Sequence, residues 1–294
     1  MSPPPASLRL VPTLCHAILA ATLVSTAAPA DDLSVPPPDL LDAAAAGDAA
    51  LTGRAIYQRV LDNTYDSFIQ TSRLYSGDRG GNEQWTRFKI WFRSDRKEGV
   101  EPAAGQVIAK SRVQYTEPYE IRHAGYLVLS RADRVNDQFV YMPSQRRVKR
   151  VNLRGEAVFG SDFSFEDLLP REIEDAVYRR LADERTLGRD CFVIEATPEK
   201  DARSEYSRMI VYIDKQRSIP LLTRYWNGRE IEFKELKADP ESVERIEGVW
   251  VAKRMTMRHL KLETYSRLEL ASIQANPQLN DRTFELRQLD AHGR

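Results

Sequence analysis

The chain has little of what catalytic and metal sites are usually built from. Its 294 residues include two cysteines and four histidines. His123, His259 and His292 lie far apart in the sequence and lack the spacing of zinc ligands. No HExxH, GxSxG or CxxC motif occurs, and Gly155 and Gly160 are not followed by the Lys-Ser or Lys-Thr of a phosphate loop. The sequence therefore predicts no metal, no cofactor and no enzymatic activity.

A surplus of charge and long apolar runs are missing as well. The 43 lysines and arginines are balanced by 43 aspartates and glutamates, which gives a formal net charge of zero. The basic surplus expected of a nucleic-acid-binding protein is thus absent, and no nucleic-acid partner is predicted. After residue 30, no stretch approaches the roughly 20 apolar residues that a transmembrane helix needs.

The first 30 residues have the features of a signal peptide. Arg9 is their only charged side chain, an apolar run extends from Ala17 to Val24, and Ala28-Pro29-Ala30 fits an A-x-A cleavage site. The alternative is a retained N-terminal anchor, for which the apolar run is short. We expect cleavage after residue 30 and export of a soluble protein.

The two cysteines predict neither a lipid anchor nor a disulfide. Cys15 precedes the apolar run, whereas a lipid-attachment cysteine follows it. Cys191 would be the only cysteine after cleavage, which excludes an intramolecular disulfide even in an oxidising compartment. Its place in the apolar run Cys191–Ile194 predicts a buried thiol of the core.

Residues 31–50 form a predicted linker, and residues 51–290 a single predicted domain. The linker contains three consecutive prolines at 36–38 and an alanine run. In the domain, Thr52 is placed to cap an amphipathic helix that ends near Asn63. The apolar face of this helix is made of Ile56, Tyr57, Val60 and Leu61.

Most of the remaining domain alternates between apolar and polar residues, which predicts strands with one apolar and one wet face. The predicted strands are Phe68–Tyr75, Trp85–Arg93, Val107–Tyr115, Tyr126–Arg131, Gln138–Met142, Arg147–Asn152, Val177–Ala182, Cys191–Ala196, Arg208–Ile213, Leu221–Trp226, Glu230–Leu236, Val249–Arg258 and Leu260–Leu270. Asn227-Gly228 predicts a two-residue hairpin turn. The pattern favours a mainly β fold, an antiparallel sheet that curls toward closure.

A strongly curved sheet with few helices is expected to enclose an apolar cavity. The candidates for its lining are Phe88, Ile90, Phe92, Val140, Met142, Met255, Met257, Leu262 and Leu268. Methionine suits such a lining because its thioether is flexible. The alternative is that these residues pack against one another as an ordinary core, since alternation shows an apolar face but not whether that face is filled.

The stretch Arg146-Arg147-Val148-Lys149-Arg150 places cations on both faces of a predicted strand. Arg146 and Arg150 would share the face of Val148, and Arg147 and Lys149 would point the other way. A buried strand does not accommodate charge on both faces, so an edge or rim strand is expected.

Two interpretations of these cations remain open. In the first, they hold a lipid phosphate or an acidic partner. The candidates for this contact are Arg147, Lys149 and Arg150. In the second, they are solvated edge charges paired with Asp162, Glu166 or Asp167.

A second short helix is predicted at 164–169. Ser164 is placed at its cap, Glu166 and Asp167 lie in its first turn, and Pro170 stops it. Adjacent residues of a helix point in different directions, so a capping role is favoured over a catalytic carboxylate pair.

The segment Phe159–Leu168, with its Gly-Ser-Asp-Phe-Ser-Phe-Glu-Asp-Leu string, is the most distinctive of the chain. With several other stretches it resembles the outer-membrane lipoprotein-sorting-like proteins of Gram-negative bacteria, which are relatives of the periplasmic carrier LolA. The branch is the one typified by an uncharacterised spirochaete lipoprotein domain. The other matching stretches are Gly53–Leu61, Phe139–Pro143, Arg146–Val151, Gly188–Cys191 and Asp214–Pro220.

The resemblance covers residues 50–290 and implies a LolA/LolB-like fold, an unclosed half β-barrel with helices over its mouth. It implies a periplasmic shuttle for acyl chains or for the lipid tail of a lipoprotein, in partnership with a large inner-membrane exporter. Arg54 and Arg59 become candidates for the arginine with which lipoprotein carriers latch their lid.

The function expected from these features is that of a soluble, monomeric periplasmic carrier of a lipid or lipidated protein, acting in outer-membrane biogenesis. The alternative is a periplasmic adaptor that carries no cargo and docks its basic edge onto a transporter or envelope complex. An enzyme is the third hypothesis, and it lacks a nucleophile and base in a recognisable pattern.

Overall fold

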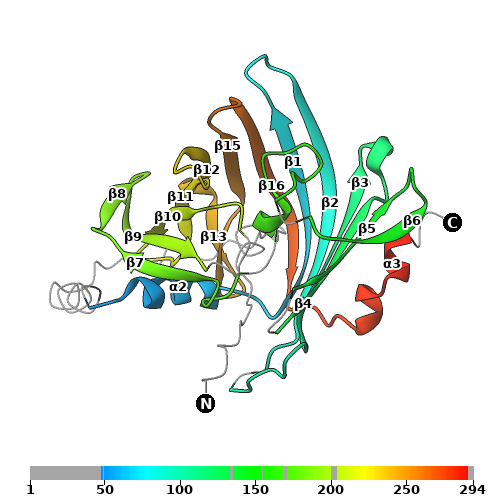
Figure 1. Ribbon diagram of the computed structural model, residues 1–294, viewed down its shortest axis with the longest axis horizontal. Coiled ribbons are helices and arrows are strands. Elements are labelled where there is room, and N and C mark those ends of the chain that lie inside the picture. The colour runs from blue at the N-terminus through cyan, green and yellow to red at the C-terminus, as the bar shows by residue number, and fades with distance from the viewer. Residues whose placement is uncertain are drawn as a thin grey trace, which may run out of the picture.

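A computed structural model describes residue 48 and residues 50–290, except for residues 98, 133–134, 154, 169–170 and 200–203 and the side chain of Leu168 (Figure 1). The predicted signal peptide, Cys15 and nearly all of the predicted linker lie outside the described residues. Within the part that is described, no helix combines the length and the apolar character needed to cross a membrane.

In the described part of the chain, fourteen strands form one antiparallel sheet. Their order from edge to edge is β6-β5-β4-β3-β2-β1-β16-β15-β12-β11-β10-β9-β7, with β8 also paired to β9. The pairing of β1 with β16 joins the first and last strands of the chain at the middle of the sheet. The sheet bends without closing, so β6 and β7 remain as its two edges (Figure 1). The prediction of a mainly β, unclosed half-barrel fold is confirmed.

The strands are β1 (Ser67–Gly77), β2 (Glu83–Ser94), β3 (Val107–Glu117), β4 (Gly125–Arg131), β5 (Asp137–Met142), β6 (Arg147–Val151), β7 (Ala176–Arg180), β8 (Glu184–Thr186), β9 (Arg189–Pro198), β10 (Arg208–Asp214), β11 (Pro220–Trp226), β12 (Glu232–Ala238), β15 (Arg254–His259) and β16 (Thr264–Ala275). β13 (Val243–Ile246) and β14 (Val249–Ala252) pair separately. The helices are α2 (Gly53–Asp62) and α3 (Arg287–Asp290), with 3-10 turns η2 (Tyr119–Ile121), η3 (Phe165–Leu168), η5 (Pro240–Ser242) and η6 (Asp281–Phe284).

Most predicted strands are found with bounds shifted by one or two residues, β8 and β13 were not predicted, and two predicted strands differ more. The run from 249 to 258 is divided at Lys253 between β14 and β15. The strand predicted at 260–270 begins only at Thr264, because His259 pairs with Thr264 and the residues between them form the turn. Leu260 and Leu262 therefore lie in this turn, where they are 43% and 63% exposed.

The turn between β11 and β12 is wider than the predicted two-residue hairpin at Asn227-Gly228. It spans residues 227–231, and Asn227 N donates to the Ile231 carbonyl at 3.1 Å. The Asn227 side-chain oxygen also accepts from the backbone N–H groups of Arg229 and Ile231. This capping by an asparagine side chain stabilises the longer turn, and the left-handed residue is Glu230, at φ 56°, in place of Gly228.

The predicted amphipathic helix is confirmed as α2. Thr52 caps it, since its hydroxyl accepts from Ala55 N at 3.2 Å. Ile56, Tyr57, Val60 and Leu61 form its buried face, as expected. The helix packs on β7 and β9, which places it over one half of the sheet (Figure 1).

Gly53 allows the start of α2 to approach β7 closely. A Cβ at this position would lie 2.8 Å from Arg180 N and 2.9 Å from Arg179 C, which are backbone atoms that cannot move aside independently. We expect Gly53→Ala to lower the free energy of unfolding by about 1 to 3 kcal/mol through overpacking, as measured by urea denaturation. In the matched control Gly228→Ala, the new Cβ meets nothing within 4 Å, so its effect should stay within about 0.5 kcal/mol. Equal effects of the two substitutions would contradict this account of the helix contact.

Side chains pack on both faces of the sheet. We call the face that carries α2 the inner face; its core contains most of the buried apolar residues. A smaller cluster on the outer face joins Leu127 and Tyr141 to Phe284 and Leu289 of the C-terminal segment. Cys191 is fully buried in the inner core, which confirms the predicted core thiol, and burial raises its pKa to about 11.

The connection between β6 and β7 has to cross the whole sheet, because these strands are its two edges. We call this connection, residues 152–175, the strap. It runs over the inner face, where Val158, Phe163 and Phe165 join the core (Figure 1). The strap contains the distinctive segment Phe159–Leu168, so that segment covers the inner face as the predicted lid would.

Candidate functional site

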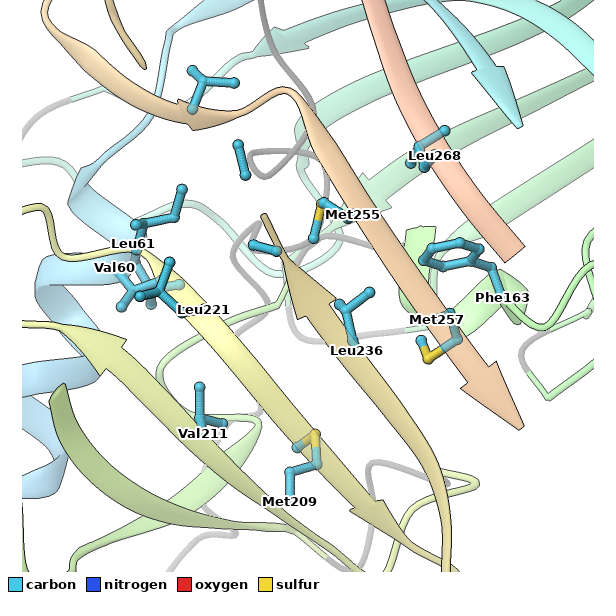
Figure 2. Close-up of a cluster of buried hydrophobic side chains, with 14 of the residues drawn as sticks. Val60, Leu61, Phe163, Met209, Val211, Leu221, Leu236, Met255, Met257 and Leu268 are labelled. Atoms are coloured by element: carbon cyan, nitrogen blue, oxygen red, sulfur yellow. The ribbon is translucent and has the colours of Figure 1, made fainter. Parts of the chain in front are cut away.

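A narrow apolar cavity lies beneath α2, on the half of the sheet formed by β10, β11, β12 and β15. Its free volume is about 40 Å³, and it opens to solvent. In Figure 2, Val60 and Leu61 of α2 point toward Leu221 of β11. The apolar residues of the cavity wall are Val60, Met209, Val211, Ile219, Leu236 and Met255. The wall also contains the Tyr57 and Tyr225 rings and the Asn63 side chain.

Arg171 of the strap also contributes to the cavity wall. Its Nη1 lies 2.7 Å from the Met209 sulfur. Burial alone would lower the pKa of this guanidinium, but the Tyr57 hydroxyl and the Glu166 and Asp167 carboxyls raise it. Arg171 therefore stays charged at the boundary between the strap and the cavity.

Two buried carboxylates fix the centre of the strap. Asp167 accepts from the Ser164 N–H at 2.8 Å and from the Tyr206 hydroxyl at 2.8 Å. Glu166 accepts from the Ser204 hydroxyl and from Glu205 N. The predicted capping role thus applies in part to Asp167, whereas for Glu166 it is wrong: that side chain turns away from its own helix to the segment between β9 and β10. The direction of the predicted cap is also reversed: the hydroxyl and the backbone N–H of Ser164 both donate to the Asp167 carboxylate.

The first part of the strap is attached to β16 and to the aromatic residues of β3 and β4. Asp162 accepts from the hydroxyls of Thr264 and Ser266, and its N–H donates to the Ser266 hydroxyl at 2.8 Å. The Phe159 and Tyr115 ring centroids are 4.4 Å apart, and those of Phe165 and Tyr126 are 4.8 Å apart. In Figure 2, Phe163 points toward Met257 of β15. These contacts place the strap aromatics over β3, β4 and β15 of the inner face.

The last part of the strap is held by arginines from two other elements. Arg54 of α2 donates to the Glu174 carboxylate at 2.7 Å and to the Ile173 carbonyl at 3.2 Å. Arg96, just after β2, donates to Glu172 at 2.7 Å. Glu172 is fully buried, and burial raises its pKa to about 9 against the opposing effect of Arg96. The helix and the strap thus form one hydrogen-bonded cover.

The predicted cavity residues are brought together, but mostly in a filled part of the core. Phe88, Ile90, Phe92, Met255, Met257 and Leu268 are buried in one cluster, with Val140 and Met142 packed against it. Met255 alone among the nine lines the apolar cavity. Leu262, in the turn before β16, instead borders an open hollow of about 480 Å³ between the β1–β2 turn and the strap.

The residues that line the apolar cavity were not among the predicted ones, apart from Met255. Tyr57 and Val60 were assigned only to the apolar face of the predicted amphipathic helix. Met209, Val211 and Leu236 were assigned only to alternating strands. Their shared location depends on which strands lie below α2, and the sequence carries no signal for that. Arg171 follows Pro170 as one cation among many and carries no signal either.

The cationic strand is β6, an edge of the sheet, as predicted. Arg146 lies outside it, in the turn at φ 50°, so its predicted place on the face of Val148 is wrong. Arg150 forms an ion pair with Asp137. The pairing suggested with Asp162, Glu166 or Asp167 is not seen: these residues bind other parts of the strap and its neighbours. Across the described residues, no group of three or more potential ligands is arranged to hold a metal ion.

Several solved structures share the fold of this chain. A proposed outer membrane lipoprotein-sorting protein domain from Vibrio parahaemolyticus matches with 23% identity and a TM-score of 0.71, covering 81% of this chain and 98% of that one. A DUF1329 family protein from Desulfovibrio piger matches with 21% identity and a TM-score of 0.73, over 81% and 99%. A LolA superfamily protein from Nitrosomonas europaea matches with 19% identity and a TM-score of 0.62, over 80% and 98%.

Two family models match the sequence itself. One, described as DUF1329, a protein of unknown function, matches residues 46–153. The other, described as an uncharacterised protein, matches residues 109–291, more than half of the chain. A comparison with the sequences of curated proteins gives no match. The chain therefore has a LolA-like fold and belongs to the family, described as uncharacterised, whose model matches its residues 109–291.

Proposed function

We propose that this protein is a periplasmic carrier that binds the acyl chains of a lipid or of a lipidated protein in the cavity beneath α2. The observation that carries the proposal is this cavity, whose wall consists mainly of aliphatic side chains and which opens to solvent. Cavities of this kind take apolar ligands because few polar groups have to be desolvated. The LolA-like fold supports the proposal by analogy, which concerns architecture and not cargo.

The energy available is sufficient for a carrier. Burial of an acyl chain stabilises a complex by about 0.8 kcal/mol per methylene group. A dozen methylenes would therefore supply roughly 10 kcal/mol, compared with about 8 kcal/mol for micromolar affinity. Association itself costs about 4 kcal/mol or more, so micromolar, reversible binding needs a longer chain of about 16 methylenes.

The cover formed by α2 and the strap would control access to the cavity. Val60 on α2 and Arg171 on the strap both line it. In the state described here the cavity is narrow, and we expect a long acyl chain to enter only when the strap and α2 separate. The predicted lining residues that pack in the filled core, which are all except Met255 and Leu262, would then serve as an extension of the site, with the strap aromatics displaced from them.

In this proposal the protein is exported, acts as a monomer and exchanges its cargo with a large inner-membrane exporter. Such a role needs no catalytic group, and the carboxylates of the strap serve to position the cover. The cargo would be delivered toward the outer membrane, in lipoprotein or lipid sorting.

Filling the cavity tests the proposal. We expect Val211→Trp to weaken binding of a dansyl-labelled fatty acid at least about tenfold, since the indole would occupy the space of the acyl chain at a cost in stability of about 1 to 3 kcal/mol. Probe fluorescence measures the affinity, and thermal unfolding shows whether the variant is folded. Leu236→Trp provides a second filling variant from another strand.

The matched control is Val177→Trp, the same substitution on β7 where the side chain is 59% exposed. It should bind the probe like the original protein. Native mass spectrometry of protein purified from a bacterial periplasm should also show copurified lipid, which the filled variants lose. Equal affinity of all variants, or absence of both lipid and probe binding in the original protein, would refute the carrier function.

A further inference from the structure

β6 differs from the other strands of the sheet in its combination of charge and position. It pairs with β5 on one side only and is the edge of the sheet. Arg147 and Arg150 are exposed, and Lys149 is half-buried. Only Arg150 forms an ion pair, with Asp137. For Arg146, Arg147 and Lys149, no carboxylate of a described residue lies within ion-pair distance.

The opposite edge provides an internal comparison. β7 and β8 also carry arginines, but acidic neighbours neutralise them. Arg179 pairs with Glu195 at 2.9 Å, Arg180 with Asp183 at 2.9 Å, and Arg185 lies 3.7 Å from Asp190. Cations on an edge strand commonly serve only to oppose aggregation. The two edges of this sheet nevertheless differ, since the charge on β6 is largely left without an acidic neighbour.

The register of β6 shows where its cations lie. Arg147 is opposite Met142 and Lys149 is opposite Val140. Both partners pack on the inner core, so these two cations lie on the inner-face side of the edge. Arg150 is on the other side, since it follows Lys149 along the strand. A strand added beside β6 would present its own side chains alternately to the same two sides.

We propose that β6 binds an acidic, extended segment of a partner protein, which adds to the sheet as a further strand. The backbone of the partner would pair with the free side of β6, and acidic side chains at alternate positions would lie beside Arg147 and Lys149. Main-chain hydrogen bonds supply affinity in this mode of recognition, and the side-chain pairs supply specificity. The proposal does not depend on whether the protein carries lipid.

Two other occupants fit the edge less well. A second copy of the chain would place the cations of one β6 beside those of the other, and like charges on paired strands are destabilising. An anionic membrane would also need apolar side chains to insert. Of the exposed large apolar side chains in the described part of the molecule, none lies on β6.

The test uses the whole protein and a short fluorescent peptide of alternating valine and glutamate. Fluorescence anisotropy measures its affinity, and hydrogen exchange of residues 147–151 reports protection of the strand. Arg147→Glu with Lys149→Glu should weaken binding at least about tenfold, because two attractive pairs become repulsive. The charge-matched control, Arg179→Glu with Arg185→Glu on the opposite edge, should bind like the original protein.

Backbone pairing is tested separately with two peptides, each N-methylated at one of the two sets of alternate residues. Only the set whose N–H groups face β6 contributes donors, so one methylated peptide should lose binding and the other should keep it. Equal binding of both would overturn strand addition, as would equal loss in the two double variants. Failure of the peptide to bind, or binding of phosphatidylglycerol vesicles through Arg147 and Lys149 in its place, would overturn the proposed partner.

Discussion

Replacement of Asp167 by alanine should lower the free energy of unfolding by about 3 kcal/mol, because it breaks a buried, charged hydrogen-bond network. The carboxylate accepts from Ser164 N and from the Tyr206 hydroxyl. Burial raises the pKa of Asp167, and the largest opposing effect comes from the nearby Lys234 ammonium. Its removal would leave three buried donors, the N–H and hydroxyl of Ser164 and the hydroxyl of Tyr206, without their acceptor. Urea denaturation measures the change, and hydrogen exchange should show faster exchange along the strap.

Two controls separate this effect from a general cost of losing a carboxylate. Asp190→Ala removes a partner of Arg185 from an exposed pair with side chains 73% and 72% accessible, so it should cost less than about 0.5 kcal/mol. Combining Asp167→Ala with Tyr206→Phe should cost less than the sum of the single changes, because both remove the same hydrogen bond. Strict additivity would mean that Asp167 does not act through Tyr206.

The stability of the protein should decrease as the pH rises from about 5 to about 9, because of Glu172. Burial raises the pKa of this carboxyl from 4.5 to about 9, although Arg96 opposes the shift. Between these values the folded state holds a proton that the unfolded state has lost. The stabilisation is therefore complete below the unfolded pKa and is lost as the pH rises through the folded one.

Glu172→Gln should remove this dependence, because its side-chain oxygen can still accept from Arg96 and the group never ionises. Each unit of pKa separation corresponds to about 1.4 kcal/mol. Allowing for relaxation around a buried charge, we expect the stability difference between variant and original protein to change by about 3 kcal/mol across the window. Urea denaturation at several pH values measures this.

The matched control is Glu174→Gln, two residues along the strap in a partly exposed pair with Arg54. Its stability curve should follow that of the original protein. Parallel curves for Glu172→Gln and the original protein would show that the buried carboxyl does not set the pH dependence.

The fold was predictable to a large extent because its determinants are local. Phe88, Ile90 and Phe92 alternate with Lys89 and Trp91, and in the structure they are buried on one face of β2. Thr52 and the apolar stripe that follows it predicted α2 correctly. The errors lie in turns, as at Asn227, where a side-chain hydrogen bond stabilises a wider loop than the sequence pair suggests.

The site was less predictable, since its location depends on what fills the inner face. The alternation of apolar and polar residues along a strand is the same whether the apolar side faces a cavity or the aromatic rings of another segment. Phe159 and Phe165 of the strap pack on β3 and β4, and Phe163 also joins the inner core, so the remaining cavity lies beneath α2. No local pattern specifies that these rings cross the sheet.

The sequence by itself determined the mainly antiparallel β architecture, the helix α2, the buried thiol of Cys191 and the edge position of the cationic strand, because periodicity, capping and charge placement act over a few residues. Only the tertiary structure decided that β1 pairs with β16, that the strap spans from β6 to β7, that Glu166 and Asp167 of the strap are buried, and that Arg171 of the strap lies at the cavity wall. These features depend on contacts between residues far apart in the chain. Their stability comes from burial and from hydrogen bonds that exist only after the sheet has formed.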